Sequence, residues 1–477
     1  MLTRKTTLAL LLAGAIVAAC AINPATGRRE LMMISEDQEI AMGREYDPQL
    51  VAEMGLVPDS ALQRYVRTLG MQMATKSERP NLPWTFRVVD DPVVNAFAVP
   101  GGFVYITRGI LAHFNSEAQL VAVLGHEIGH VTARHSAAQM SRAQLAQVGL
   151  AVGSAVSERF AQMAELGSAG VGILFLKYGR DDETQADALG LRYMRRSGHD
   201  VREMPGVYAM LASLSGDAGR STPDWLSTHP APEDRQARIQ RAIAAMPQDS
   251  LGSIVERDSY LRRLEGLTYG PNPRHGYFVG QTFNHPDMRF TMTFPEGWAT
   301  QNATQSVTAL SAEKNAMIQL TLSRAPSADS ALRAFAGQQG LQAGTVSRPA
   351  LRGFASSSAM PFAALVESDT LRGRVLFVEH GGVVLQLIAY GPAAGWTAQQ
   401  AVAERALGSF AVLTDRAALE VQPRRVSIVR VDRAMTITQM RAGRASALSA
   451  AELAVINQVR VDEVLPVGRM VKWVVGS

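Results

Sequence analysis

The residues best suited to chemistry are His-Glu-Ile-Gly-His at positions 126–130. Residues four apart on an α-helix lie about 40° from each other and one turn along, so His126 and His130 would share one face. Two imidazole nitrogens placed in this way can bind one zinc ion at ~2.0–2.1 Å. Glu127 lies beside them and could take a proton from an activated water. The pattern predicts part of a catalytic zinc site, and the alternative is a helix with two buried histidines.

A catalytic zinc ion needs a third protein ligand, either another histidine or a carboxylate, and an open position for water. The acidic run at 180–187 could supply this ligand. The residues alone do not separate Asp182 from Glu183, and a solvated acidic helix start is a further interpretation. Cysteine ligands are excluded because the only cysteine in the 477 residues is Cys20.

The apolar pattern predicts the elements that must position these residues. Ser116 and Gln119 form a capping box ahead of an apolar-periodic run, so a helix should begin just after Ser116. The chain reads as mostly helical from 36 to 266, with short strands expected at 84–89 and 102–107.

The order of these motifs resembles zinc metallopeptidase family 48, the lineage of the CAAX prenyl proteases, the HtpX-type proteases and the periplasmic BepA-type proteases. H-E-x-x-H is followed at 183–190 by E-x-x-A-D-x-x-G. The resemblance covers about residues 24–270 and implies a mainly helical zincin domain of the gluzincin type, with a small sheet and one zinc ion per chain. It implies the following roles: Glu127 as catalytic base, His126, His130 and Glu183 as zinc ligands, and Asp187 as a carboxylate that orients a ligand histidine.

Two further segments resemble parts of this family. The run Asn-Ala-Phe-Ala-Val-Pro-Gly-Gly at 95–102, followed by Tyr105 and Thr107, resembles the family's strand beside the cleft. This resemblance implies that an extended peptide is held by β-addition, through Gly102, Phe103, Val104 and Tyr105. Ser-Thr-His-Pro at 227–230, with Arg235, resembles the late S/T-H-P…R motif. His229 would either approach the metal as a fourth, water-displacing ligand or pack at a helix start. Arg235 would either stabilise a developing oxyanion or pair with an acid.

Two other segments near the motifs have structural interpretations. His135 is five residues beyond His130, about 140° around a continuous helix, and is expected to be structural. Residues 138–176 are rich in alanine, glycine and methionine. They would form either a mobile lid over the site, as in relatives, or a plain core helix.

The N-terminus predicts export. Arg4 and Lys5 precede a short apolar run, and Val-Ala-Ala at 17–19 comes directly before Cys20. This resembles a bacterial lipobox, which implies a signal peptide at 1–19, lipidation of Cys20 and an anchor on the periplasmic face of the outer membrane. A plain signal peptide is the alternative. Residues 20–35 are expected to be a polar tether.

Composition changes after Pro-Asn-Pro at 271–273, and alternating apolar residues follow. We therefore expect a separate α+β domain at 275–415, without a catalytic constellation. Residues 424–477 resemble a LysM-like module, although Arg-Ala-Met at 433–435 stands where Gly-Asp is usual. Peptidoglycan is therefore a possible partner of this segment. The fold class is α+β multidomain.

These expectations combine into a zinc metalloendopeptidase of the bacterial envelope that cleaves misfolded or misassembled envelope polypeptides. The alternative is a chaperone-like outer-membrane assembly factor with latent protease activity. With a formal net charge of +4 and no dense basic patch, the chain shows no sign of nucleic-acid binding.

Overall fold

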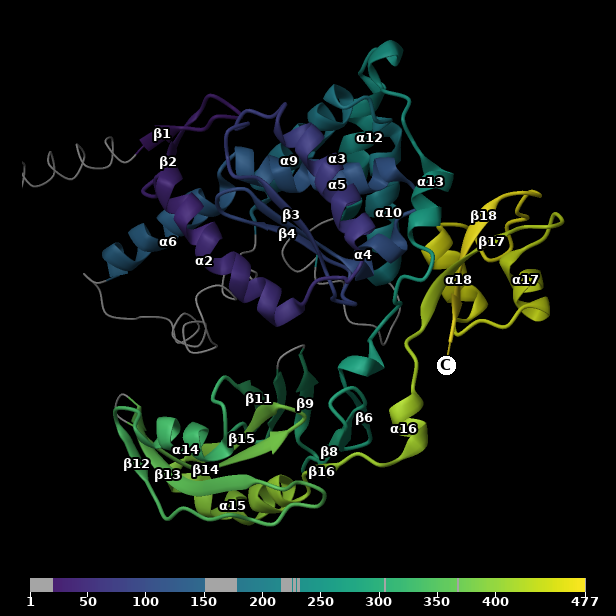
Figure 1. Ribbon diagram of the computed structural model, residues 1–477. Helices are drawn as coiled ribbons and strands as arrows, with labels where there is room; N and C mark the ends of the chain where they lie inside the picture. The colour runs from purple at the N-terminus through teal and green to yellow at the C-terminus, as the bar shows by residue number, and fades with distance from the viewer. Residues whose placement is uncertain are drawn as a thin grey trace, which may run out of the picture. The chain divides into compact units, whose positions relative to one another are not determined.

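The computed structural model describes residues 20–150, 178–215, 225, 229, 232–303, 306–366 and 369–476. The predicted signal peptide, residues 151–176 of the predicted lid, and Ser227, Thr228 and Pro230 lie outside the described residues. The chain forms two compact units (Figure 1): the first contains residues up to 270 together with 424–476, and the second is built on 271–423. Among the described helices, none has the length and apolar character that a bilayer span requires.

The first unit is mainly helical, as the sequence predicts. Its helices are α2 (Glu36–Met54), α3 (Ser60–Ala74), α4 (Arg108–His113), α5 (Glu117–Thr132), α6 (His135–Leu150), α9 (Arg180–Arg196), η1 (Val201–Glu203), α10 (Met204–Ser215), α12 (Pro232–Ala244), η2 (Gln248–Ser250), α13 (Arg257–Arg263), α17 (Ile437–Gly443) and α18 (Ala450–Asn457). Its strands are β1 (Cys20–Ile22), β2 (Arg29–Leu31), β3 (Thr85–Val89), β4 (Ala96–Val99), β5 (Phe103–Thr107), β17 (Arg425–Arg430) and β18 (Met470–Val475).

Helix α5 contains the His-Glu-x-x-His motif and packs against α3, α9 and α10. Ser116 caps it by accepting a hydrogen bond from the Gln119 amide at 3.2 Å, as expected. The Gln119 side chain does not complete the predicted capping box, because it accepts from the Asn115 amide instead. The start of α5 contacts the segment that follows α9: His199 Nε2 lies 3.1 Å from Glu117 Oε1.

A three-stranded sheet has the order β3-β5-β4, with β3 parallel and β4 antiparallel to β5. The strand expected to bind a peptide, Gly102, Phe103, Val104 and Tyr105, is therefore the central one. Both of its backbone edges are paired, so it cannot accept an added strand. The prediction of this substrate strand was wrong, because residue types alone do not show which neighbouring run lies at the edge.

Residues 20–35, expected to be a polar tether, pack against the first unit. Strands β1 and β2 pair as an antiparallel hairpin. The buried side-chain amide of Asn23 donates to the Ala133 carbonyl, at the end of α5, at 2.9 Å. Met32 and Ile34 pack against Ala137 and Ala138 of α6. The segment is thus bound to the helices that follow the metal motif.

Residues 424–476 belong to the same compact unit as the peptidase helices. Their elements occur in the order β17, α17, α18, β18, with β17 and β18 antiparallel. Val426 and Met470 join the main apolar core of the first unit. Lys472 is fully buried, and its Nζ donates to the carbonyls of Ala112 (2.8 Å) and Phe114 (2.7 Å), just ahead of α5.

The second unit is α+β, as predicted for 275–415. A seven-stranded antiparallel sheet has the order β12-β13-β14-β15-β11-β10-β9, and a four-stranded sheet has the order β16-β8-β7-β6. Along β14, Val375 and Phe377 pack with α14 while Leu376 and Val378 pack with α15, since alternate side chains face opposite sides of a sheet. The elements are η3 (Pro273–His275), β6 (Tyr277–Val279), β7 (Thr282–His285), β8 (Phe290–Thr293), β9 (Ala299–Asn302), β10 (Ser306–Leu310), β11 (Met317–Ser323), α14 (Ala328–Ala336), β12 (Leu341–Ala343), β13 (Ser357–Val366), β14 (Asp369–His380), β15 (Val383–Pro392), α15 (Ala393–Gly408), β16 (Ala411–Val412) and α16 (Arg416–Glu420).

Candidate metal centre

Two helices lie unusually close together at the centre of the first unit. Small residues on α5 face small residues on α9: a Cβ on Gly125 would lie 3.3 Å from Gly190 Cα, and a Cβ on Gly129 would lie 3.1 Å from the Ala186 carbonyl oxygen. These contacts are as tight as side chains allow. The close approach brings the polar face of α9 against the histidines of α5.

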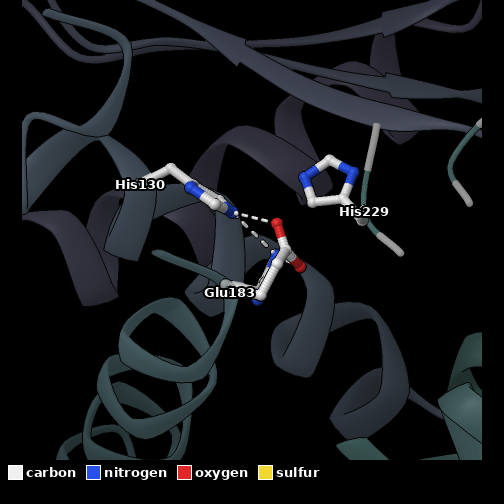
Figure 2. Close-up of side chains that lie close together, drawn as sticks. His130, Glu183 and His229 are labelled. Atoms are coloured by element: carbon white, nitrogen blue, oxygen red, sulfur yellow. Dashed lines mark hydrogen bonds and ion pairs between the residues drawn. The ribbon is translucent and has the colours of Figure 1, made fainter. Parts of the chain in front are cut away.

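Four buried side chains meet at this contact. His126, His130, Glu183 and His229 each offer one ligand atom, and these atoms lie within 4.8 Å of one another. The two histidine Nε2 atoms are 3.0 Å apart, and the Glu183 carboxylate oxygens lie 3.5 Å and 3.7 Å from them. Figure 2 shows the Glu183 carboxylate beside His130, with the His229 imidazole on its other side.

The donor set fits a zinc ion. Ligand atoms of a tetrahedral zinc site with bonds of ~2.0–2.1 Å are separated by roughly 3.3 Å, close to the separations of 3.0–3.7 Å found here. Behind His126, Asp187 Oδ1 lies 3.1 Å from Nδ1. An ionised carboxylate only accepts hydrogen bonds, so His126 carries its hydrogen on Nδ1 and presents a bare Nε2 to the cluster.

The electrostatics of the donor set also favour a cation. Burial raises the pKa of Glu183 to about 8, although Arg235 opposes the shift. Burial, with repulsion from Glu183, raises the pKa of Glu127 well above its usual value, while a hydrogen bond from Trp225 opposes it. Burial lowers the pKa of His126 to about 4. A divalent cation binds neutral imidazoles, and its charge would stabilise the ionised form of carboxylates that burial disfavours.

Asp187 and Arg235 form the layer behind the ligands. Arg235 Nη1 lies 2.5 Å from Glu183 Oε2, and Arg235 Nη2 lies 2.6 Å from Asp187 Oδ1. Burial by itself would raise the pKa of Asp187, but Arg235 and His126 outweigh it and hold the pKa well below the usual range. Tyr208 donates to the same carboxylate at 2.6 Å. The structure thus shows Arg235 in the acid-pairing arrangement of the two that the sequence left open.

The structure distinguishes Asp182 from Glu183 as candidate metal ligands. Asp182 lies at the start of α9, where its carboxylate accepts from the Gly179 amide at 3.2 Å. Glu183, on the next position of the helix, is buried and faces the histidines.

His229 lies close to the predicted base. Its Nε2 is 3.8 Å from Glu127 Oε1, and its ring stacks on Trp225 with centroids 4.6 Å apart. The Trp225 amide reaches the Val94 carbonyl at 3.4 Å, at the entry to β4. His229 therefore stands both at the metal cluster and in an aromatic packing contact.

The estimate that placed His135 about 140° around the helix from His130 does not hold, although it led to the expectation of a structural residue. It assumed a continuous helix, whereas α5 ends at Thr132 and Arg134 adopts a left-handed conformation with φ of 60°. The turn starts α6 in a new direction, and His135 Nδ1 comes within 2.8 Å of His130 Nδ1.

Two aromatic residues at the site gave no signal in the sequence. Tyr178 stacks on His130 with centroids 3.9 Å apart, and Tyr208 bonds Asp187. Neither belongs to a motif with fixed spacing, so only the fold places them here.

Residues 60–243, which include every member of the cluster, match the model for peptidase family M48. These residues form an M48 peptidase domain. The M48 family uses zinc, and the cluster at His126, His130, Glu183 and His229 is where this domain can bind the ion.

The chain is similar to two groups of curated proteins over part of its length. The chain is 33% identical over 212 residues to the beta-barrel assembly-enhancing protease of Yersinia pestis, covering 42% of this chain and 43% of that protein. It is 31% identical over 210 residues to the mitochondrial metalloendopeptidase OMA1 of Arabidopsis thaliana, covering 43% of this chain and 42% of that protein. The chain thus spans less than half the length of these relatives. Among solved structures, cyanobacterial PsbP from Synechocystis sp. PCC 6803 matches 28% of this chain and 94% of its own, with 13% identity and a TM-score of 0.24.

Proposed function

We propose that the chain is a zinc-dependent metalloendopeptidase of the bacterial envelope that cleaves misfolded or misassembled envelope polypeptides. The observation that carries this proposal is the buried cluster of His126, His130 and Glu183, with the Glu127 carboxylate beside it. The similarity to a beta-barrel assembly-enhancing protease and to a metalloendopeptidase supports both the activity and the class of substrate.

The residues divide the chemistry between them. His126, His130 and Glu183 would hold the ion, and a bound zinc ion supplies a Lewis acid that polarises a peptide carbonyl and makes water more acidic. Glu127 removes the proton from the attacking water and returns it to the leaving amine nitrogen. Asp187 and Arg235 keep His126 and Glu183 in place.

The experiment that tests the activity is the substitution Glu127→Gln. The variant should retain zinc, because Glu127 is not a ligand, and should lose at least a hundredfold in the rate of casein cleavage, because a general base contributes ~10²–10⁴-fold. Glu117→Gln is a matched control, since Glu117 lies on the same helix, in its first turn. Cleavage by Glu127→Gln at the wild-type rate would refute the assignment.

For the substrate, we propose that an extended polypeptide adds to strand β4. Among the described residues β4 pairs only with β5, so its other edge is the one at which a strand could be added. An unfolded outer-membrane β-barrel polypeptide should be cleaved by the wild-type chain and the same protein in its folded form should not. Equal cleavage of both forms would contradict the proposed class of substrate.

A chaperone-like assembly factor with latent protease activity is the second candidate. The position of His229, in the ligand cluster and 3.8 Å from Glu127, favours latency because the fourth ligand position is then filled. If His229 is a latch, His229→Ala should raise casein cleavage severalfold. Unchanged or lower cleavage would assign His229 to packing against Trp225.

We also propose that Cys20 carries the lipid anchor and that the chain lies at the periplasmic face of the outer membrane. Export of a tagged chain in a bacterial host should give palmitate labelling that Cys20→Ser abolishes. Labelling that persists in the variant would contradict the assignment.

Peptidoglycan binding by the LysM-like segment is a further proposal. Helix α17 begins after Thr436, where the resemblance places the first helix, and Val464 and Val467 are exposed on the loop that precedes β18. The full chain should sediment with purified sacculi, and Val464→Asp with Val467→Asp should weaken this binding.

A further inference from the structure

The imidazole of His130 is supported by a second imidazole, whereas that of His126 is supported by a carboxylate. His130 Nδ1 lies 2.8 Å from His135 Nδ1, and His135 Nε2 lies 2.5 Å from Oε1 of Gln185 on α9. Both histidines are buried. The three side chains form a row of hydrogen bonds that begins on the half-buried Gln185 and ends at the metal cluster.

The side chain of Gln185 decides which atom donates in each of these hydrogen bonds. The side-chain oxygen of Gln185 can only accept, so His135 carries a hydrogen on Nε2. A neutral imidazole with its hydrogen on Nε2 has a lone pair at Nδ1. That lone pair accepts the Nδ1–H of His130. The Nε2 atom of His130 is then bare, and it faces His126 and Glu183.

Support of His130 by a neutral histidine suits the negative charge already present at the site. Glu127, Glu183 and Asp187 are all buried at the site, and Arg235 pairs with two of them. A carboxylate behind His130 would add negative charge in a region of low dielectric constant. A histidine fixes the ring of His130 without adding a charge.

We propose that His135 and Gln185 are positioning residues that hold the hydrogen of His130 on Nδ1 and thereby present its Nε2 to the zinc ion. The proposal rests on the zinc site of the proposed function and adds the contacts that decide which nitrogen of His130 binds. Partners of this kind behind a ligand histidine are worth ~10–100-fold in metal affinity.

The test compares two substitutions of His135 in the full chain, with zinc affinity measured by competition with a chromogenic chelator. His135→Asn places an amide oxygen near the position of Nδ1 and should keep zinc affinity within about threefold of wild type. His135→Phe fills the volume but cannot accept a hydrogen bond, and should bind zinc ~10–100-fold more weakly. A packing role predicts the reverse order, because phenylalanine replaces the lost ring.

A second pair of variants acts at the half-buried end of the row, where the chain tolerates change more readily. Gln185→Glu keeps an acceptor and should retain zinc affinity. Gln185→Lys offers only donors and should weaken zinc binding at least tenfold, because His135 would then turn a hydrogen toward His130. His199→Gln is the control, since His199 is a buried histidine of the same unit that bonds Glu117 and should not affect zinc.

Two outcomes would overturn the inference. One is equal zinc affinity for wild type, His135→Phe and Gln185→Lys. The other is a loss in His135→Asn as large as that in His135→Phe. A wild-type chain that binds no zinc would refute the proposed function itself, which distinguishes that failure from failure of the positioning row alone.

Discussion

The guanidinium of Arg235 lies between two carboxylates that would otherwise be buried next to each other. It contacts Glu183 and Asp187, and the rings of Tyr208 and Trp225 lie 4.6 Å and 4.9 Å from its central carbon. This one side chain holds the pKa of Asp187 well below its usual value, opposes the rise that burial causes in the pKa of Glu183, and contacts both carboxylates directly. Arg235 thus positions Glu183 and Asp187 before any ion binds.

Arg235→Gln should destabilise the metal-free chain by about 3–5 kcal/mol, because it leaves buried carboxylates without their cation. Arg202→Gln is the control: its side chain is 58% exposed and pairs with Asp200, and because solvent screens such a pair, its loss should cost far less stability than the loss of Arg235. Urea unfolding of the two variants measures the difference. Equal losses would show that the buried pairing does not stabilise the fold.

His285, in the second unit, makes stability depend on pH. Burial lowers its pKa to about 4, against ~6.5 when unfolded, and Nδ1 accepts from the Met288 amide at 3.2 Å. The unfolded chain binds the proton more tightly, so this stabilisation is complete above pH 6.5 and is lost as the pH falls toward 4. From pH 7 to pH 5 we expect a loss of about 1–2 kcal/mol in urea unfolding. His285→Asn keeps an acceptor but cannot titrate, and should show a smaller loss.

At the scale of elements, the contact between α5 and α9 sets the geometry of the metal centre. The two helices meet through glycine and alanine, and this brings Glu183 and Asp187 to the histidines of α5. Close approach of backbones leaves no room for larger side chains at the contact.

Gly190→Ala should therefore separate the helices. Its Cβ would lie 3.2 Å from the backbone nitrogen of His126, which cannot move alone. We expect a loss of about 1–3 kcal/mol in stability and weaker zinc binding. Gly408→Ala is the matched control, since nothing lies within 4 Å of a Cβ at that helical position. A variant at 190 that matches wild type in both measurements would show that the contact can relax.

Elements with strong local signals could be predicted from the sequence. Helix α5 begins after Ser116, and β3 and β5 lie within the predicted ranges 84–89 and 102–107. Two features could not be predicted: one depends on a single backbone angle and the other on the pairing of β-strands. The left-handed turn at Arg134 redirected His135, and the place of β5 at the centre of its sheet follows from long-range pairing that residue types do not encode.

At the scale of the whole molecule, the sequence correctly indicated an α+β second unit but did not show that 424–476 is bound to the peptidase helices. Gln458 donates to the His113 carbonyl at 2.9 Å, and Asn115 donates to the Ile456 carbonyl at 3.3 Å. Contacts between residues so far apart in the chain leave no local pattern. The segment therefore supports the start of α5, the helix that carries the metal motif.

Lys472→Met should destabilise the first unit by about 1–3 kcal/mol. It leaves the carbonyls of Ala112 and Phe114 without their donor, while removal of a buried charge offsets part of this cost. Burial holds the pKa of Lys472 well below its usual value, which is the origin of that offset. Lys76→Met removes an exposed donor to the Arg196 carbonyl and should change stability by less than about 0.5 kcal/mol. Equal unfolding midpoints for the two variants would indicate that 424–476 does not support the peptidase helices.

The first unit is interrupted in the chain by the whole of 271–423. A chain that emerges N-terminus first delivers β17, β18 and Lys472 only after the intervening unit has appeared. Domains fold as units, so the intervening unit can fold while the peptidase helices still lack the segment that secures the start of α5. The metal-binding helix therefore gains its full support only after residues 424–476 have emerged.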